Sequence, residues 1–444
     1  MTLRWTLDQV AAATGGSFHG DGGLTIAAVG TDSRAVEPGS LFVAIRGDHF
    51  DGHRFAPAAI AAGAVAVVVE RGTVADDVRP RVEVEDTGTA LRDLGAHRRA
   101  QLTMPVVAVT GSTGKTSTKD LLAASIPGAA ASPRSFNNEV GVPLSVLAAD
   151  EDAAALVLEV GSRGRGHIAW LMPAVSPDVA VITNLGVVHL ETFGTVEALA
   201  DAKWELVEGL GEGGTAVVPV DQPRLRRQHR GGTVTFGGSG ADVAVDRLRL
   251  DDLGRARFTL ATHSGSAEVA LGVAGAHQAT NAAAAVAAGM AIGVDLATLA
   301  AGLETARGSP GRMEIHRGRF TVVNDAYNAN PDSVRAALRT VAVMPGRHIA
   351  VLGKMAELGP IEAEEHRRVG AEARQLGYAA VVVVGEDPGL AEGAGDLAVV
   401  VADQDAAAIT VTGIVAPGDV VLVKASRAVG LDRLAVLLAK AATI

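Results

Sequence analysis

The sequence predicts an α/β protein with three domains, and three observations support this prediction. The chain has 444 residues, which at about 150 residues per domain corresponds to three domains. Hydrophobic residues make up 48% of the chain and aromatic residues only 3%, so the apolar content is mostly aliphatic and suits buried strands packed against helices. Short apolar runs alternate with stretches of helical character, which is the pattern of parallel sheets.

Composition also excludes several classes of protein. The 50 acidic and 39 basic residues leave a net charge of −11, so we expect no broad basic surface and no nucleic-acid partner. The chain has no cysteine, which excludes disulfides, thiolate metal sites and cysteine nucleophiles. The start lacks an apolar signal core. The longest near-apolar runs, 58–69 and 282–294, are shorter than the roughly 18 residues of a membrane span. We therefore expect a cytoplasmic monomer without membrane insertion.

Residues 1–100 are predicted to form a small α/β domain. Its strand-like runs are separated by turn signals and cover Leu24–Val29, Leu41–Ile45 and Ala64–Glu70.

Residues 101–309 form the second predicted domain, built on a parallel sheet. Its candidate buried strands are Val106–Val109, Leu156–Val160, Val179–Thr183 and Thr215–Val218. We interpret the Gly-rich stretches 209–214 and 231–240 as loops of this domain.

Residues 310–444 form the third predicted domain, which begins at the breaker cluster Gly308–Gly311. Apolar runs again alternate with helical stretches, at Phe320–Val323, Ile349–Leu352, Ala379–Val384 and Val420–Val423. Within 362–376, the apolar residues Val369, Ala373 and Leu376 are spaced as one stripe of a helix.

The most specific local motif follows the first strand of the second domain. A strand, a glycine-containing loop and the start of a helix succeed one another here, as in a phosphate-binding loop. The motif consists of Gly111, Ser112, Thr113, Gly114, Lys115, Thr116 and Ser117. Lys115 is expected to reach the β- and γ-phosphates, and the Thr116 hydroxyl to ligate Mg²⁺. The alternative is a strand–helix turn with an incidental lysine, but the flanking strand and helix favour an ATP-type site.

Three further side chains are candidates for metal binding or catalysis. Glu159 lies inside an apolar run, where a buried carboxylate is costly unless it is paired or binds a metal. His189 and Lys203 follow downstream. Taken singly, each has a simpler explanation: Glu159 could face solvent at a strand end, His189 could be an ordinary surface or core histidine, and Lys203 could be a solvated helix lysine.

The order of these residues resembles that of the ATP-dependent Mur ligases of peptidoglycan synthesis. The similarity rests on the G-x-x-G-K-T-x-x-K loop, then Glu159, His189, Lys203 and Asn281, and extends over essentially the whole chain. Three strings near the start resemble the UDP-substrate domain of this family: Asp32-Ser33-Arg34, Gly39-Ser40-Leu41-Phe42 and Asp51-Gly52-His53.

Two other strings resemble those of the members that add D-alanyl-D-alanine to UDP-N-acetylmuramoyl-tripeptide. They are 137–143, which reads NNEVGVP, and 324–333, which reads NDAYNANPDS. Three alternatives remain open. They are a sister ligase that adds diaminopimelate or lysine, a nucleotide-binding paralogue without catalysis, and a kinase acting on a small molecule.

The resemblance implies a division of labour among three domains. The N-terminal domain would bind the UDP-substrate, the central domain ATP, and a C-terminal Rossmann-like domain the D-alanyl-D-alanine amine. The implied reaction transfers the γ-phosphate to the tripeptide carboxylate, and the amine then displaces phosphate from the acyl phosphate.

The resemblance also implies two Mg²⁺ ions and a modified lysine. Thr116 and Glu159 would hold the first ion, and Glu159, His189 and Lys203 the second. Lys203 would be carbamylated, which converts a cation into a metal-binding carboxylate and requires a lowered lysine pKa. The implied catalytic set consists of Lys115, Glu159, His189 and Lys203.

The remaining site residues are likewise implied by the resemblance. Asn281 would contact adenine, and Arg312 and Asp325 would reach the phosphates and ribose. Ser33 and Arg34 would contact the UDP-substrate, and five residues would contact the peptides: Asn137, Asn138, Tyr327, Asn328 and Asn330. Simpler roles exist for several of them, namely a turn at Asp32-Ser33, a helix N-cap at Asn281, a linker position for Arg312, and ordinary turn asparagines.

The chain also departs from the family pattern. Lys354 replaces a usual acid, residues 161–166 read GSRGRG, Gln278 replaces a usual Asn, and Ala425 a usual Gly. None of these positions carries a predicted nucleotide or metal ligand, so the departures concern the peptide and amine side of the site.

Overall fold

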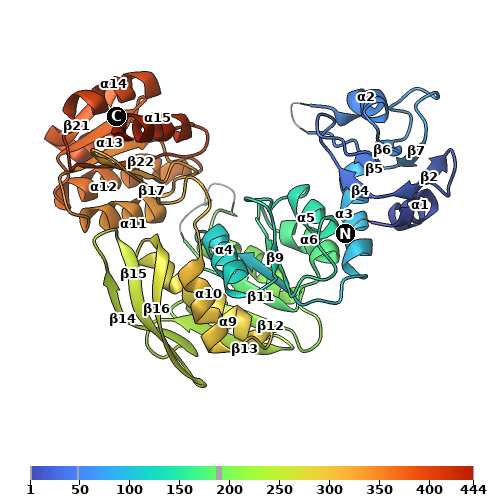
Figure 1. Cartoon of the computed structure of the whole chain (residues 1–444), viewed down its shortest axis with the longest axis horizontal. Coiled ribbons are helices and arrows are strands. Elements are labelled where there is room, and N and C mark those ends of the chain that lie inside the picture. Colours follow the sequence, from blue (N-terminus) through green and yellow to red (C-terminus); the bar gives the residue numbers. More distant parts are fainter. Residues whose placement is uncertain (1–2, 48–49, 187–192, 444) are drawn as a thin grey trace.

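The protein is described from a computed structural model, and the structure describes residues 3–47, 50–186 and 193–443. Within these residues, sheets of five, nine and six strands follow one another along the chain, beside a two-stranded ribbon of β1 (Trp5–Thr6) and β3 (Thr25–Ile26). The N-terminal and C-terminal parts stand on opposite sides above the central part (Figure 1). The predicted three-domain α/β fold is confirmed.

The N-terminal sheet has the order β2-β7-β6-β5-β4. Its strands are β2 (Ser17–His19), β4 (Ala28–Gly30), β5 (Ser40–Val43), β6 (Ala66–Glu70) and β7 (Arg81–Val84). One face packs against α1 (Leu7–Thr14) and α3 (Thr87–Arg99), the other against α2 (Ala56–Ala61). The single strand predicted at 24–29 is instead two, because β3 pairs with β1 whereas β4 pairs with β5.

The central sheet has the order β16-β15-β14-β13-β12-β11-β8-β10-β9. It comprises β8 (Val106–Thr110), β9 (Ala130–Ala131), β10 (Leu156–Glu159), β11 (Val179–Ile182), β12 (Thr215–Pro219), β13 (Gly232–Gly237), β14 (Val243–Leu250), β15 (Arg255–Thr262) and β16 (Gly265–Ala274). Strands from β9 to β14 are parallel, and β14 to β16 are antiparallel.

Two expectations for this sheet were wrong. Residues 231–240 are not a loop throughout, because β13 lies within them and pairs with β12. Phe236 anchors this strand in the core with 1% of its surface exposed. The antiparallel addition of β14, β15 and β16 was also not predicted, since the sequence indicated only a parallel sheet.

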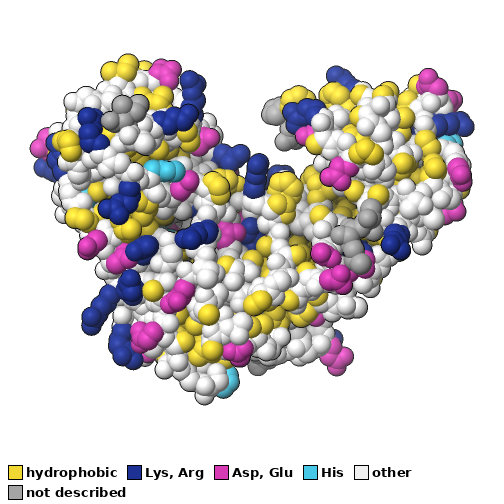
Figure 2. Space-filling model, in the orientation of Figure 1, with side chains coloured by type: hydrophobic (Ala, Val, Ile, Leu, Met, Phe, Trp, Pro, Cys, Tyr) yellow, Lys and Arg dark blue, Asp and Glu magenta, His cyan; other side chains and the backbone are white. Residues whose placement is uncertain are grey.

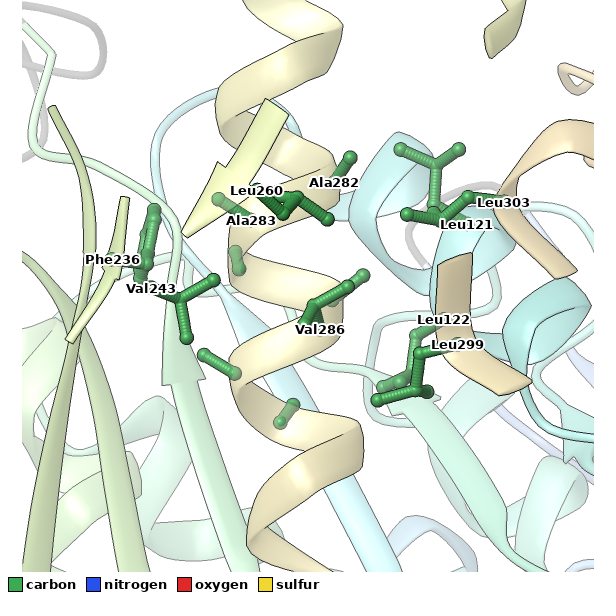
Figure 3. Close-up of a cluster of buried hydrophobic side chains, with 14 of the residues drawn as sticks. Leu121, Leu122, Phe236, Val243, Leu260, Ala282, Ala283, Val286, Leu299 and Leu303 are labelled. Carbon is green, nitrogen blue, oxygen red and sulfur yellow. The ribbon is translucent and has the colours of Figure 1, made fainter. Parts of the chain in front are cut away.

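Helices cover both faces of the central sheet. On one face lie α4 (Lys115–Ser125), α9 (His277–Ala291) and α10 (Leu296–Thr305). Figure 3 shows Leu121 beside Leu303 and Leu122 beside Leu299 in this layer. Alanines dominate the buried face of α9, and such small side chains let neighbouring elements approach closely. On the other face lie α5 (Gly141–Leu147), α6 (His167–Val175) and α8 (Val196–Glu208). Coverage on both faces explains why the central strands are almost continuously apolar.

The C-terminal sheet has the order β17-β18-β22-β19-β20-β21 and is parallel except for β17. Its strands are β17 (Glu314–Arg317), β18 (Thr321–Asn324), β19 (His348–Gly353), β20 (Ala380–Val384), β21 (Ala398–Val401) and β22 (Val420–Lys424). One face packs against α11 (Pro331–Ala342), α12 (Glu362–Gln375) and α13 (Pro388–Ala394), the other against α14 (Gln404–Ile414) and α15 (Asp432–Thr443). The predicted stripe on α12 is confirmed, because Val369 and Ala373 are fully buried.

The strand registers of the central sheet place the candidate site. Glu159, at the end of β10, pairs with Val109 of β8, and Ile182 of β11 pairs with Thr110. The carboxyl ends of these three parallel strands therefore meet at one edge, where ligands bind in open α/β sheets. Over the described part of the chain, the helices are too short or too polar to span a membrane.

Candidate active site

The phosphate-loop motif forms the turn between β8 and α4, and its two glycines are required by geometry. Gly111 has φ of 145°, and a Cβ there would lie 1.9 Å from Thr183 Oγ1. Gly114 has φ of 78°, and a Cβ there would lie 2.5 Å from Asn281 Oδ1. Both positions combine a left-handed backbone with a close neighbour, so side chains are excluded.

The loop is also held by the end of β11, which the sequence analysis missed. Asn184 accepts from the backbone N–H of Ser112 at 3.1 Å through its carbonyl, and from that of Thr113 at 2.9 Å through its side chain. Thr183 Oγ1 donates to the Thr113 carbonyl at 2.5 Å. The available signal was their position at the end of a predicted strand of the same parallel sheet.

Two lysines lie close to this loop, of which Lys115 is partly buried and Lys203 fully buried. Lys115 Nζ donates to the Gly111 carbonyl at 2.8 Å. Burial lowers the pKa of Lys115, which the nearby Glu159 carboxylate opposes. Lys203, on α8, is 1% exposed, so it is not a solvated helix lysine. Burial, and then the charge of Lys115, lower the pKa of Lys203 well below its ordinary value. Both effects shift Lys203 toward its neutral amine.

Glu159 is buried at the centre of the site rather than facing solvent, with 1% of its surface exposed. Its Oε2 accepts from Thr116 Oγ1 at 2.7 Å, and its Oε1 accepts from Asn137 Nδ2 at 2.6 Å. The side chains of these three predicted site residues thus meet. In the described residues, no three His, Asp or Glu side chains cluster as a ready metal site. His189 lies outside the described residues.

The C-terminal domain contributes cations and an aromatic ring. Arg312 Nη2 donates to Thr116 Oγ1 at 2.9 Å, so this linker residue reaches the phosphate loop. The Arg312 guanidinium lies 4.3 Å from the centre of the Tyr327 ring, and the Arg427 guanidinium 5.0 Å from it. Cations at these distances attract the ring face and hold Tyr327 in place.

Asp325 is held by an ion pair. Its Oδ2 lies 2.6 Å from Lys424 Nζ, and its Oδ1 accepts from the Met313 backbone N–H at 3.1 Å. Lys424, which the sequence analysis also missed, is 2% exposed and donates to the Asn328 carbonyl at 2.9 Å. His277, exposed at the start of α9, lies within the field of these two charges.

Two of the predicted asparagines make hydrogen bonds that shape the backbone. Asn138 accepts from the Gly141 backbone N–H at 2.8 Å at the start of α5, and Asn330 caps α11 through the Ser333 backbone N–H at 2.9 Å. Both side chains therefore have structural bonds. Asn281 is not a helix N-cap, because α9 begins at His277. Its Nδ2 instead donates to Gln278 Oε1 at 3.0 Å, and the pair faces the phosphate loop.

A cavity of about 610 Å³ joins the central and C-terminal contributions. The predicted site residues that line it are Ser112, Thr113, Gly114, Lys115, Thr116, Ser117, Asn137, Glu159, Asn281, Arg312, Asp325, Tyr327, Asn328 and Asn330. Gly111, Asn138 and Lys203 do not line it. Figure 2 shows the molecule hollowed between its upper lobes, with Lys and Arg side chains along the floor of the hollow.

Ser33 and Arg34 do not line this cavity. They lie between β4 and β5, where Arg34 Nη2 is 2.7 Å from Asp32 Oδ2 and the Arg34 side chain is 87% exposed. The side-chain hydrogen bond from Arg34 lowers the pKa of Asp32 to about 2. Asp32 Oδ1 also accepts from the Arg34 backbone N–H at 3.0 Å, so the simpler interpretation, a turn, describes this segment as it stands.

Two residues that depart from the family pattern form exposed ion pairs outside this cavity. Lys354 Nζ lies 2.8 Å from Glu362 Oε1, and Arg163 Nη1 lies 3.1 Å from Glu139 Oε1. Gln278, in contrast, lines the cavity beside Asn281.

Comparisons with known proteins agree across the chain. Residues 25–99 match the Mur ligase family, catalytic domain; residues 109–289 match the Mur ligase middle domain; and residues 311–427 match the Mur ligase, glutamate ligase domain. The UDP-N-acetylmuramoyl-tripeptide–D-alanyl-D-alanine ligase of Mycobacterium tuberculosis is 39% identical, over 91% of this chain and 90% of that protein.

Solved structures are similar over the same extent. MurF from Acinetobacter baumannii superposes with a TM-score of 0.91 at 31% identity, covering 99% of both chains. MurF from Thermotoga maritima, solved in complex with ADP, superposes with a TM-score of 0.83 at 32% identity, covering 93% of this chain and 97% of that one. The sequence motifs, the fold and these similarities agree: the chain belongs to the Mur ligase family.

Proposed function

We propose that this protein joins D-alanyl-D-alanine to UDP-N-acetylmuramoyl-tripeptide with hydrolysis of ATP to ADP and phosphate. This proposal rests mainly on one cavity. In it, the phosphate loop and Glu159 face Arg312, Asp325 and Tyr327 of the C-terminal domain. The name of the similar ligase from M. tuberculosis supports this substrate choice. The product would be UDP-N-acetylmuramoyl-pentapeptide.

ATP would lie on the phosphate loop at residues 111–117. The start of α4 offers unpaired backbone N–H groups and a favourable dipole to the phosphates, and Lys115 adds a positive charge beside them. Asn281, next to Gly114, would contact adenine, and Arg312 and Asp325 would reach the phosphates and ribose. The ADP complex of the T. maritima relative supports nucleotide binding here.

The residues present fit Mg²⁺. This ion is typically held by one or two carboxylates together with phosphates and water, and the Thr116 hydroxyl and the Glu159 carboxylate already lie 2.7 Å apart. Thr116, Glu159, His189 and carbamylated Lys203 would hold two ions. The shift of Lys203 toward its neutral amine suits carbamylation, since only the neutral form reacts with CO₂. Bound Mg²⁺ would neutralise charge on the phosphates.

The reaction requires two anions to meet. An oxygen of the tripeptide carboxylate attacks the γ-phosphorus while the bond to ADP breaks, which gives an acyl phosphate. The dipeptide amine then attacks the acyl carbon, loses a proton to solvent, and phosphate leaves with the carboxylate oxygen. Lys115 and Arg312 would offset the repulsion between carboxylate and phosphates, so charge neutralisation and positioning dominate catalysis.

The domain assignment is part of this proposal. Residues 1–100 would bind the UDP-substrate through Ser33 and Arg34, residues 101–309 ATP, and residues 310–444 the dipeptide. Asn137 and Asn138, from the central domain, and Tyr327, Asn328 and Asn330, from the C-terminal domain, would contact the peptides. We also propose that the protein works as a monomer in the cytoplasm.

A substrate panel tests this function. The purified protein is incubated with Mg·ATP, UDP-N-acetylmuramoyl-tripeptide and one amine at a time, namely D-alanyl-D-alanine, diaminopimelate, lysine or no amine. We expect ADP and a new UDP-linked product, detected by mass spectrometry, only with D-alanyl-D-alanine. A product formed with a different amine would contradict the D-alanyl-D-alanine assignment, and ATP binding without any product from the tripeptide would exclude the proposed ligation.

A further inference from the structure

A buried ion pair lies on α4, one turn beyond the phosphate loop. Lys119 is 2% exposed, and its Nζ lies 3.0 Å from Asp120 Oδ1. The same Nζ donates to the carbonyls of Ser132 at 2.8 Å and Arg134 at 2.9 Å. Neither lysine nor aspartate lines the cavity, so the proposed reaction does not use this pair directly.

The two carbonyls belong to a loop, residues 132–137, that reaches the metal and phosphate residues. Asn137 Nδ2 donates to Glu159 Oε1 at 2.6 Å, and Ser132 Oγ accepts from the Glu159 backbone N–H at 3.2 Å. Ser135 Oγ lies 3.4 Å from Thr116 Oγ1. The orientation of the Glu159 carboxylate therefore depends on where this loop lies.

Arg134 makes the loop dependent on outside support. Its φ is 50°, a left-handed conformation that side chains with a Cβ adopt only when their surroundings hold them there. The hydrogen bond from Lys119 to the Arg134 carbonyl is such a restraint. Because a buried ammonium is costly unless all its donors are satisfied, Lys119 and the loop hold each other in one arrangement.

Asp120 extends this arrangement to the C-terminal domain. Its Oδ2 accepts from Ser309 Oγ at 2.5 Å. Ser309 lies in the linker after α10, three residues before Arg312, which donates to Thr116. This ion pair lies on the helix that follows the phosphate loop, and it bonds to two other segments. They are the loop that contacts Glu159 and the linker that leads to Arg312.

We propose that Lys119 and Asp120 are positioning residues that hold loop 132–137 and the Ser309 linker against α4, so that Asn137 and Arg312 meet at Glu159 and Thr116. The metal-binding consequence rests on the proposed function, but the restraint on the loop does not. Residues that orient metal ligands typically change metal affinity by about 10-fold to 100-fold when they are lost.

Hydrogen exchange without nucleotide tests the restraint itself. Lys119→Met removes the ammonium but keeps most of the side-chain volume. We expect the peptide covering 132–137 to exchange at least about 10-fold faster, because its backbone loses its restraint. Arg98→Met is the matched control, since Arg98 is also buried, donates to the Ala149 carbonyl at 3.0 Å and pairs with Glu151. Unchanged exchange in 132–137, or equal acceleration in both variants, would overturn the proposal.

Kinetics test the consequence for the site. We expect Lys119→Met to raise the Mg²⁺ concentration for half-maximal turnover by about 10-fold, with high Mg²⁺ restoring part of the rate, and Lys119→Arg to recover most of it. Arg98→Met should leave the Mg²⁺ dependence unchanged. A lower thermal midpoint with a normal Mg²⁺ dependence would reduce Lys119 to a purely structural role and contradict the proposal.

Asp120→Asn tests the same proposal if Lys119→Met does not fold. It retains the Lys119 bonds to the loop but removes the charge partner, so we expect a smaller acceleration of exchange in 132–137 and a smaller rise in the Mg²⁺ requirement. No change in either quantity would overturn the proposal. If the wild-type protein shows no ligase activity, the proposed function fails, whereas the exchange comparison still decides the positioning role.

Discussion

The central phosphate site and the N-terminal Ser33–Arg34 segment are both predicted to bind phosphate-bearing substrates, yet they are built differently. Around Thr116 and Glu159, the side chains are buried and joined by short hydrogen bonds at the ends of parallel strands. Arg34, in contrast, is exposed and paired with Asp32 two residues away. The first arrangement is held by bonds among the side chains of the site itself, whereas Arg34 would have to exchange a local partner for a substrate.

This difference determines how strongly each substitution should act. A side chain that is preorganised in a buried site costs little to align with the reacting groups, and its loss removes a large part of the stabilisation of the transition state. An exposed ion pair is screened by solvent and contributes little. We therefore expect large effects on turnover at the phosphate site and small effects on binding at the N-terminal segment.

The largest effect is expected for Lys203→Ala. If Lys203 is carbamylated, this change removes a metal-binding carboxylate, and ligation should fall below detection by mass spectrometry of the UDP-linked product. An excess of CO₂ should not restore it, whereas a short carboxylic acid such as acetate should restore part of it. Lys440→Ala, at an exposed lysine in the last turn of α15, is the control. Wild-type turnover in Lys203→Ala would contradict the carbamate proposal.

The next largest effect is expected for Glu159→Gln. The amide keeps the size of the side chain but removes the charge that would face Mg²⁺, so turnover should fall by about 10²- to 10³-fold, as for the loss of one preorganised electrostatic group. The folded state should remain, as judged by an unchanged circular dichroism spectrum. Glu208→Gln, at an exposed position on α8, should behave as wild type. Comparable turnover in the two variants would remove Glu159 from the catalytic set.

A smaller effect is expected for Asn281→Ala. Loss of an adenine contact should raise the KM for ATP by about 10-fold, equivalent to ~1.4 kcal/mol, and change kcat less. The measurement is initial rate against ATP concentration with both other substrates saturating. An unchanged KM would leave Asn281 with only its hydrogen bond to Gln278.

The smallest effect is expected for Arg34→Ala. A severalfold rise in the KM for the UDP-substrate, with the KM for ATP and kcat unchanged, would show that the Asp32–Arg34 pair opens to the substrate. The same KM for the UDP-substrate as in wild type would mean that this segment is only a turn, and the two regions would then differ in function as well as in construction.

Features set by neighbouring residues in the sequence were predictable, whereas features set by contacts between distant segments were not. The strand–loop–helix pattern around Lys115 and the buried run at Glu159 were predictable, because each is a local pattern with a physical cost attached. Thr183, Asn184 and Lys424 were not, because they reach the site only through strands that neighbour one another in the sheets. The strand at 232–237 was missed for a related reason, since its glycines indicate a loop while pairing with β12 stabilises a strand.

Asn137 and Asn138 show what a local sequence pattern cannot distinguish. Asn137 and Asn138 are adjacent in sequence, and no local signal separates them. In the fold, Asn137 donates to Glu159, whereas Asn138 accepts from the Gly141 backbone N–H at the start of α5. A family resemblance assigns both to the peptide site, and only the geometry distinguishes a bond to the buried Glu159 carboxylate from a bond that shapes the loop.

Transfer of heavy oxygen tests the central claim most directly. UDP-N-acetylmuramoyl-tripeptide labelled with heavy oxygen in its terminal carboxylate is incubated with Mg·ATP and D-alanyl-D-alanine, and the inorganic phosphate is examined by mass spectrometry. Ligation through an acyl phosphate predicts that each phosphate released carries one carboxylate oxygen, with equal amounts of pentapeptide product. Unlabelled phosphate, or phosphate released without product, would contradict the proposed reaction.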